Sequence, residues 1–142
     1  MILKVDTENY AGKRLRKAIA IKTNDPQRSQ INLTIEGKVV RFVTIDPKII
    51  ILKGDIGKEL LNSIRIFPEK KYPFNIVQVH TEKKQNFRYR LSLLNKDGQK
   101  GYLLTVWNIK KDPGRYVDAI YLETDNDIGP IIRIPVFGNI TQ

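Results

Sequence analysis

Alternating apolar and polar residues run along most of the chain. Ile31, Leu33 and Ile35 alternate with polar neighbours, and about a hundred residues later Ile132 and Ile134 do the same. A period of two is typical of a β-strand with one buried face. Such runs predict strands over 41–46, 48–53, 57–67, 75–80, 86–94, 101–109, 116–123 and 130–137. Seven or eight short strands, with no convincing helical stretch, predict an all-β antiparallel sandwich.

Two of these strands carry features that bear on their packing. In the strand 86–94, alternation predicts an apolar face of Phe87, Tyr89, Leu91 and Leu93 and a polar face of Arg88, Arg90 and Ser92. In the last strand, Pro135 cannot donate a hydrogen bond to a neighbouring strand. We therefore expect the last strand to lie at a sheet edge, or to contain a bulge, at this residue.

Two segments of the chain repeat each other. Ala18, Ile19 and Thr23 recur as Ala119, Ile120 and Thr124, an offset of 101 positions, and Gly37 recurs as Gly138 at the same offset. A period of about a hundred residues matches one β-sandwich domain. The repeat predicts that 1–40 holds the last hairpin, strands F and G, of a preceding domain. It predicts that 41–142 is one complete domain.

The first hairpin lacks the rest of its own sandwich. Its apolar face consists of Ile19, Ile21, Ile31, Leu33 and Ile35. Because a lone two-stranded hairpin is marginally stable in water, this face has to be covered. The sequence leaves three candidates for the cover: the following domain, a second copy in a homodimer formed through residues 13–37, or the missing strands of its own sandwich.

Composition narrows the classes of function. The chain has no cysteine, which excludes disulfides, thiolate metal sites and a cysteine nucleophile. His80 is the single histidine, so one chain cannot supply a multi-histidine metal site. No apolar run reaches the roughly 18 to 20 residues that span a bilayer. The first six residues are too short and polar for a signal peptide. No cofactor is expected.

The segment before the second copy contains a short motif. Asp112-Pro113-Gly114-Arg115-Tyr116 resembles the tyrosine corner at the start of strand F in immunoglobulin-like sandwiches. In that motif, formed here by Asp112, Gly114 and Tyr116, the phenol hydroxyl bonds to backbone a few residues upstream. Asp118 stands where antibody domains place their second cysteine, and Trp107 falls on the predicted strand E. The chain therefore departs from the antibody pattern.

The ending of each copy gives a second resemblance. Thr23-Asn24-Asp25-Pro26, followed by alternating apolar residues and a closing Gly-x-Val, is similar to the bacterial Ig-like repeats of unknown function. That family is related to Hydin-like (ASH-type) and PapD-like sandwiches. The resemblance implies an immunoglobulin-like sandwich in an exported multidomain protein, with no established catalytic residues. The second copy, Thr124 to Asp127, lacks the proline.

Both copies place a charge in strand F. Lys17 and Asp118 stand two residues before the shared isoleucine, in phase with residues expected to be buried. A charge on a fully buried face is costly. We therefore expect this end of the strand to be open to solvent or bulged.

The formal net charge of +10 is the main hint of a binding function. Three basic clusters stand out: Lys13, Arg14, Arg16 and Lys17; Lys83, Lys84, Arg88 and Arg90; Lys110, Lys111 and Arg115. They could form a surface for nucleic acid, acidic polysaccharide or anionic lipid. Alternatively, and more in keeping with strand faces, they are solvated residues that keep sheet edges from aggregating.

Other candidate sites have simpler interpretations. Asp125 and Asp127 could ligate calcium, but their position favours turn residues. His80 lies near the end of a predicted strand with no nucleophile or orienting acid in its motif. Ser29, Ser63 and Ser92 lie in no nucleophile elbow. The sequence thus favours a non-catalytic module that binds a protein partner or neighbouring repeat domains, with polyanion binding as the alternative.

Overall fold

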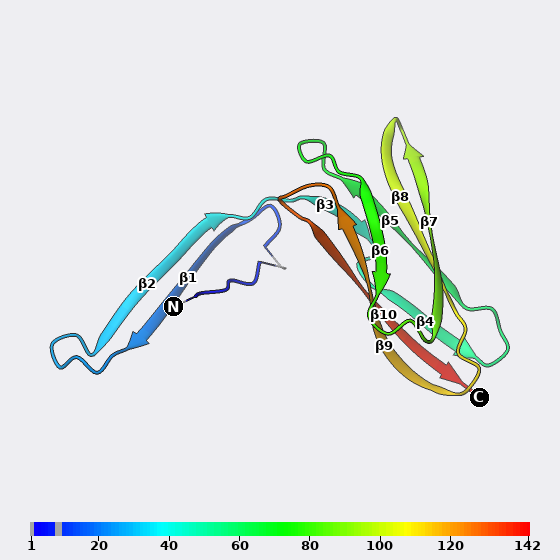
Figure 1. The fold of residues 1–142 in the computed structure, drawn as a ribbon, viewed down its shortest axis with the longest axis horizontal. Helices are drawn as coiled ribbons and strands as arrows, with labels where there is room; N and C mark the ends of the chain where they lie inside the picture. Colours follow the sequence, from blue (N-terminus) through cyan, green and yellow to red (C-terminus); the bar gives the residue numbers. More distant parts are fainter. Residues whose placement is uncertain (1, 8–9) are drawn as a thin grey trace. The chain divides into compact units, whose positions relative to one another are not determined.

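The computed structural model describes residues 2–7 and 10–142, which form ten strands and no helix. They belong to two compact units, Met1–Arg41 and Phe42–Gln142 (Figure 1). The first unit contains a two-stranded antiparallel sheet of β1 (Arg14–Lys22) and β2 (Gln30–Lys38). The second unit contains the other eight strands.

The second unit is a sandwich of two four-stranded sheets. One sheet has the order β3 (Val43–Asp46), β5 (Leu61–Pro68), β8 (Gln99–Asn108) and β7 (Phe87–Lys96). The other has the order β4 (Ile50–Asp55), β10 (Ile131–Thr141), β9 (Gly114–Thr124) and β6 (Ile76–Thr81). The predicted all-β, immunoglobulin-like sandwich with an extra hairpin is confirmed.

One pairing departs from the predicted antiparallel arrangement. The chain leaves the first sheet after β3 and enters the second as β4, which runs parallel to β10 from Ile50 opposite Val136 to Asp55 opposite Thr141. The two short strands are joined across Pro47. This switch lets the start of the domain contribute one edge strand to each sheet.

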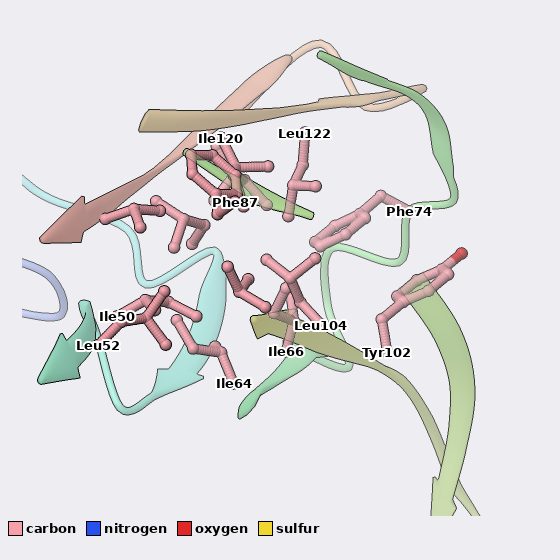
Figure 2. Packing of buried hydrophobic residues seen from close by; sticks show 14 residues of the cluster. Ile50, Leu52, Ile64, Ile66, Phe74, Phe87, Tyr102, Leu104, Ile120 and Leu122 are labelled. Carbon is pink, nitrogen blue, oxygen red and sulfur yellow. The ribbon is translucent and has the colours of Figure 1, made fainter. Parts of the chain in front are cut away.

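Aliphatic side chains fill the space between the sheets. Ile64, Ile66 and Leu104 project from one sheet, and Ile120 and Ile134 from the other, all with no exposed surface. Figure 2 shows side chains of both sheets meeting in one cluster, with Phe74 and Tyr102 at one end. Full burial of such a side chain contributes roughly 1.5–3 kcal/mol, so this cluster is the main source of stability.

The apolar face predicted for β7 is buried at Phe87 and partly buried at Leu91, which packs against the core. Phe87 is 6% exposed, but Tyr89 is 36% and Leu93 69% exposed. The far end of the β7–β8 hairpin turns at Asp97–Gly98, where both residues have positive φ. Figure 1 shows this end projecting beyond the neighbouring strands.

The two repeated segments form hairpins with the same register. In β1–β2, Leu15 lies opposite Gly37 and Ile19 opposite Leu33. In β9–β10, the residues at the 101 offset pair in the same way: Tyr116 lies opposite Gly138, and Ile120 opposite Ile134. The remaining pairs of the first hairpin, from Lys22–Gln30 at the turn to Arg14–Lys38 at the open end, also recur in the second. Their counterparts run from Glu123–Ile131 to Arg115–Asn139.

The turns of the two hairpins share their hydrogen bonds as well. The hydroxyl of Thr23 donates to the carbonyl of Arg28, and that of Thr124 donates to Gly129. The next shared bond is from a backbone N–H to a side chain two residues earlier. Gln27 donates to Asp25 Oδ1, and Ile128 donates to Asn126 Oδ1, both at 2.9 Å. Asp and Asn side chains both stabilise a turn in this position, so the turn is the same in both copies although the residue differs.

Pro135 lies on β10 just before the parallel pairing with β4 begins at Val136. Among the described residues, β9 alone pairs with β10 over Ile131–Pro135. This stretch is therefore a sheet edge, as the missing N–H of proline requires.

The expected solvent exposure near Asp118 is wrong. Asp118 is 2% exposed. Its Oδ1 accepts hydrogen bonds from the backbone N–H groups of Lys83, at 3.1 Å, and Ala119, at 2.7 Å. These donors replace water around one carboxylate oxygen and so reduce the cost of burial. Asp118 Oδ2 and Thr81 Oγ1 are buried, and the described residues offer neither of them a hydrogen-bond partner.

Candidate interaction surfaces

The tyrosine motif joins β8 and β9, which stand as strands E and F of the sandwich, through a side chain. Tyr116 at the start of β9 donates its hydroxyl hydrogen to Asn108 Oδ1, at 2.9 Å. Asn108 ends β8, and its amide donates to the carbonyl of Lys110. The expected bond to upstream backbone is therefore replaced by a bond to a side chain that is itself tied to the loop backbone. Asp112 and Gly114 lie in and just after that loop, where the positive φ of Gly114 favours glycine.

Tyr116 also explains the closing glycine of the second copy. A Cβ at Gly138 would lie 2.1 Å from Cε1 of Tyr116, because the ring rests directly on the glycine. Burial, and then the neighbouring Asp118 carboxylate, raise the pKa of Tyr116 to about 12. The Tyr116 side chain thus ties together β8, β9 and β10.

Two of the predicted basic residues share a face with residues that the sequence did not single out. Arg88 and Arg90 of β7 point outward from the sheet β3–β5–β8–β7. Their partners on β8, Trp107 and Thr105, alternate along that strand with the buried Leu104 and Val106. Trp107 of β8 lies opposite Arg88, and Arg65 of β5 points outward on the same sheet. We call Arg65, Arg88, Arg90 and Trp107 the arginine face. Alternation about Ile64, Ile66 and Val106 was the signal that could have revealed Arg65 and Trp107.

The other predicted basic residues of the second unit do not lie on the arginine face. The Lys83 ammonium donates to the carbonyl of Val117, at 3.0 Å, so this side chain is held against β9 in the other sheet. Lys84 follows it in the loop before β7. Arg115 is on β9, and Lys110 and Lys111 are in the loop before it. The second predicted cluster is therefore divided between the two sheets, and Lys83 lies against the same strand, β9, that carries Arg115 of the third cluster.

The cluster in the first unit divides between two faces of its hairpin. Arg14 and Arg16 both point to Glu36, with N–O distances of 3.6 and 3.2 Å. Lys17, on the opposite face by alternation, places its ammonium 5.6 Å from the centre of the Tyr10 ring. Lys13 precedes β1. The pairing with Glu36 reduces the positive potential that a polyanion would meet.

The residues considered for metal binding or catalysis have structural partners. Asp125 accepts hydrogen bonds from the backbone and then the side chain of Asn75, which lower the pKa of Asp125. His80 stacks on Tyr121 with ring centres 5.1 Å apart, and its Nδ1 lies 3.7 Å from Glu123. Asp127 is exposed in its turn. In the described part of the chain, no three His, Cys, Asp or Glu residues are grouped as a metal site would require.

A cleft of about 890 Å³ lies in the second unit between the β7–β8 turn and the loop after β5. Phe67, Phe74 and Tyr102 form its apolar side, and Lys70, Lys96 and Lys100 contribute cations. The Tyr102 hydroxyl already accepts a hydrogen bond from the backbone N–H of Ile76. Nothing in this lining combines a nucleophile with a base.

Comparisons with known proteins add a distant structural likeness. No family model matches the chain, and no curated protein matches it significantly. Among solved structures, it is similar to a protein of unknown function from Porphyromonas gingivalis W83, with 13% sequence identity and a TM-score of 0.44. The alignment covers 93% of this chain and 68% of that one. Such a likeness carries no argument about function. Over the described residues, we find no helix long and apolar enough to cross a membrane.

Proposed function

We propose that the chain is a non-catalytic structural and interaction module of a tandem-repeat protein. In this proposal, β1–β2 is the F–G end of one immunoglobulin-like repeat, and residues 42–142 are the next repeat. The observation that carries the proposal is the common register of β1–β2 and β9–β10 at one constant offset, together with the shared turn hydrogen bonds. The resemblance to bacterial Ig-like repeats belongs to this proposal.

The same offset extends upstream of the hairpin. It aligns Leu3 with Leu104 and Val5 with Val106, which are identical residues in phase. Leu104 and Val106 lie in strand E of the second unit and have no exposed surface. We therefore assign Ile2–Thr7 as the end of strand E of the first repeat. These residues form no strand in the structure, in keeping with the missing neighbours of strand E.

A chimera of the chain with itself tests the proposal. Residues 42–102 placed directly before Ile2 would supply second copies of β3 to β7 and of the start of β8, at the register that the 101 offset dictates. We expect backbone amides of β1–β2 to gain strong protection from hydrogen exchange, because a second sheet now covers their apolar face. Trp107, the single tryptophan, is not duplicated and continues to report on the second unit.

A one-residue insertion at the junction is the matched control. Because side chains alternate along a strand, the insertion turns Leu3 and Val5 to the opposite face. We expect protection in the first chimera and little protection in the control. If β1–β2 exchanges equally fast in both and in the natural chain, the assignment of β1–β2 to a preceding repeat is wrong.

The arginine face supports polyanion binding as the second candidate function. Three arginines and a tryptophan on one sheet face supply both cations and a stacking surface. We expect Arg88→Glu with Arg90→Glu to weaken binding to heparin or DNA and to flatten its salt dependence. Arg14→Glu with Arg16→Glu is the control, since both cations are already near Glu36. Unchanged binding in the first pair, or no binding by the natural chain, would exclude this function.

A further inference from the structure

The outward face of the sheet β4–β10–β9–β6 carries an exposed apolar row. Ile51 of β4, Phe137 of β10 and Val117 of β9 lie side by side in the ladder, because Phe137 is opposite both of the others. Their exposed fractions are 52%, 39% and 51%. We call these three residues the apolar row. Contiguous exposed apolar side chains of this kind commonly mark interaction sites.

Cations border this row. One step along the ladder, Asn139 lies between Lys53 and Arg115. On the other side, the Lys83 ammonium reaches the carbonyl of Val117, and Arg133 points outward from β10 beyond the pair Pro135–Ala119. Among the described residues, none of these four cations lies within ion-pair distance of a carboxylate.

The carboxylates around the row are fewer. Asp55 lies at one end of the face and is engaged by Thr141 and Lys58. Glu123 lies at the other end, 3.7 Å from His80, and Glu82 follows β6. The border of the apolar row therefore has an excess of positive charge.

The first hairpin shows that the fold does not require this row. At the 101 offset, Val117 and Phe137 correspond to Arg16 and Glu36, which occupy the same ladder position and form an ion pair with an N–O distance of 3.2 Å. Two residues before this position both copies have an arginine, Arg14 in β1 and Arg115 in β9. The same backbone thus accepts an ion pair where the second copy exposes valine and phenylalanine.

From this difference we infer that the outward face of β4–β10–β9–β6 binds an acidic polypeptide segment. Aliphatic or aromatic side chains of that segment cover the apolar row, and its carboxylates meet Lys53, Arg115 and Arg133. A second copy fits less well, since cations border the row on both sides and would meet cations of the partner copy. A polysaccharide or nucleic acid leaves the aliphatic side chains without apolar contact. The inference does not depend on the tandem-repeat proposal.

A synthetic peptide serves as the probe. It alternates glutamate and valine over about 12 residues, long enough at roughly 3.3 Å per residue to cross the sheet. Two matched peptides replace valine by serine or glutamate by lysine. We expect the natural chain to bind the glutamate–valine peptide, measured by fluorescence anisotropy, at least about tenfold more tightly than either matched peptide.

The first hairpin supplies the diagnostic variant. Val117→Arg with Phe137→Glu installs the pair seen at Arg16 and Glu36, so the fold is expected to persist, as circular dichroism and Trp107 fluorescence can verify. Binding should weaken at least about tenfold. Leu93→Arg, at a more exposed apolar residue on the other sheet, should leave it unchanged. If the double variant does not fold, Phe137→Ala tests the same row.

Four results would overturn the inference. They are no binding by the natural chain below about 1 mM, equal binding of all three peptides, unchanged binding in the row variants, and equal loss of binding in Leu93→Arg.

Other occupants of this face would give different results. A dimer in analytical ultracentrifugation that the row variants abolish would make this face a self-interface. Binding of phosphatidylserine–phosphatidylcholine vesicles, with no peptide binding, would make it a membrane surface. The chimera described above can fail while peptide binding persists, so the two proposals are separable.

Discussion

The hairpins β1–β2 and β9–β10 have the same register and the same turn, but their apolar faces have different surroundings. Ile134 of β10 has no exposed surface, whereas Leu33, its counterpart in β2, is 37% exposed. Ile132 is 7% exposed and its counterpart Ile31 is 41% exposed. Strand pairing and turn chemistry therefore specify the hairpin, while burial of its apolar face requires an opposing sheet. Each prediction below concerns a residue of β9–β10 that differs, in type or in surroundings, from its counterpart at the 101 offset in β1–β2.

Removing a buried side chain should have the largest effect. Ile134→Ala should lower the free energy of unfolding of the second unit by about 2–5 kcal/mol, because it leaves a cavity between the sheets. Leu33→Ala should change that value by less than about 0.5 kcal/mol. Urea unfolding followed by Trp107 fluorescence measures both. Equal losses would mean that the two faces are equally buried in solution.

Substitution of the glycine near the end of each hairpin, Gly138 or Gly37, should have the next largest difference in effect on stability. Gly138→Ala forces the Tyr116 ring to move, at a cost of about 1–3 kcal/mol. A Cβ at Gly37 would have no atom of the described residues within 4 Å, so Gly37→Ala should be neutral or slightly stabilising. Combining Gly138→Ala with Tyr116→Leu, the residue type of Leu15, should cost less than the sum of the two single changes. Simple additivity would show that the ring and the glycine do not interact.

The hydroxyl of Tyr116 gives the smallest effect, and it depends on pH. The pKa of Tyr116 in the folded chain, about 12, lies above the ordinary value of 10, so the folded state holds this proton more tightly. The resulting stability is complete below pH 10 and is lost as pH rises from 10 to 12. Tyr116→Phe should remove this part of the alkaline loss and cost about 1 kcal/mol at neutral pH through the lost hydrogen bond to Asn108. Absorbance titration of both chains should yield a difference with a midpoint near 12, and identical alkaline profiles would contradict the assignment.

The sequence predicts most of the strands because alternation and turn residues act locally. It did not predict that β4 pairs in parallel with β10, since that pairing depends on where the chain changes sheets. Burial of Asp118 was missed for a related reason. The backbone N–H of Lys83, distant in sequence, supplies a donor that no local pattern reveals.

The candidate surfaces were predictable in part. Alternation correctly placed Arg88 and Arg90 on one face, but it could not show that Lys83 is held against the other sheet. The apolar row was also hidden in the sequence. Phe137 and Val117 lie on adjacent strands, but their ladder neighbour Ile51 comes from a strand about 65 residues earlier than Val117, and only the three-dimensional register brings the three together.

Pro135 has a consequence for the behaviour of the chain at high concentration. Over Ile131–Pro135, one side of β10 has no neighbouring strand among the described residues, and Ile131 is 56% exposed there. An unpaired strand with apolar side chains is a template on which further molecules can add edge to edge. Pro135 interrupts the row of donors that such growth requires, and Arg133 adds charge repulsion beside it. This stretch of β10 is thereby protected against aggregation by its own residues.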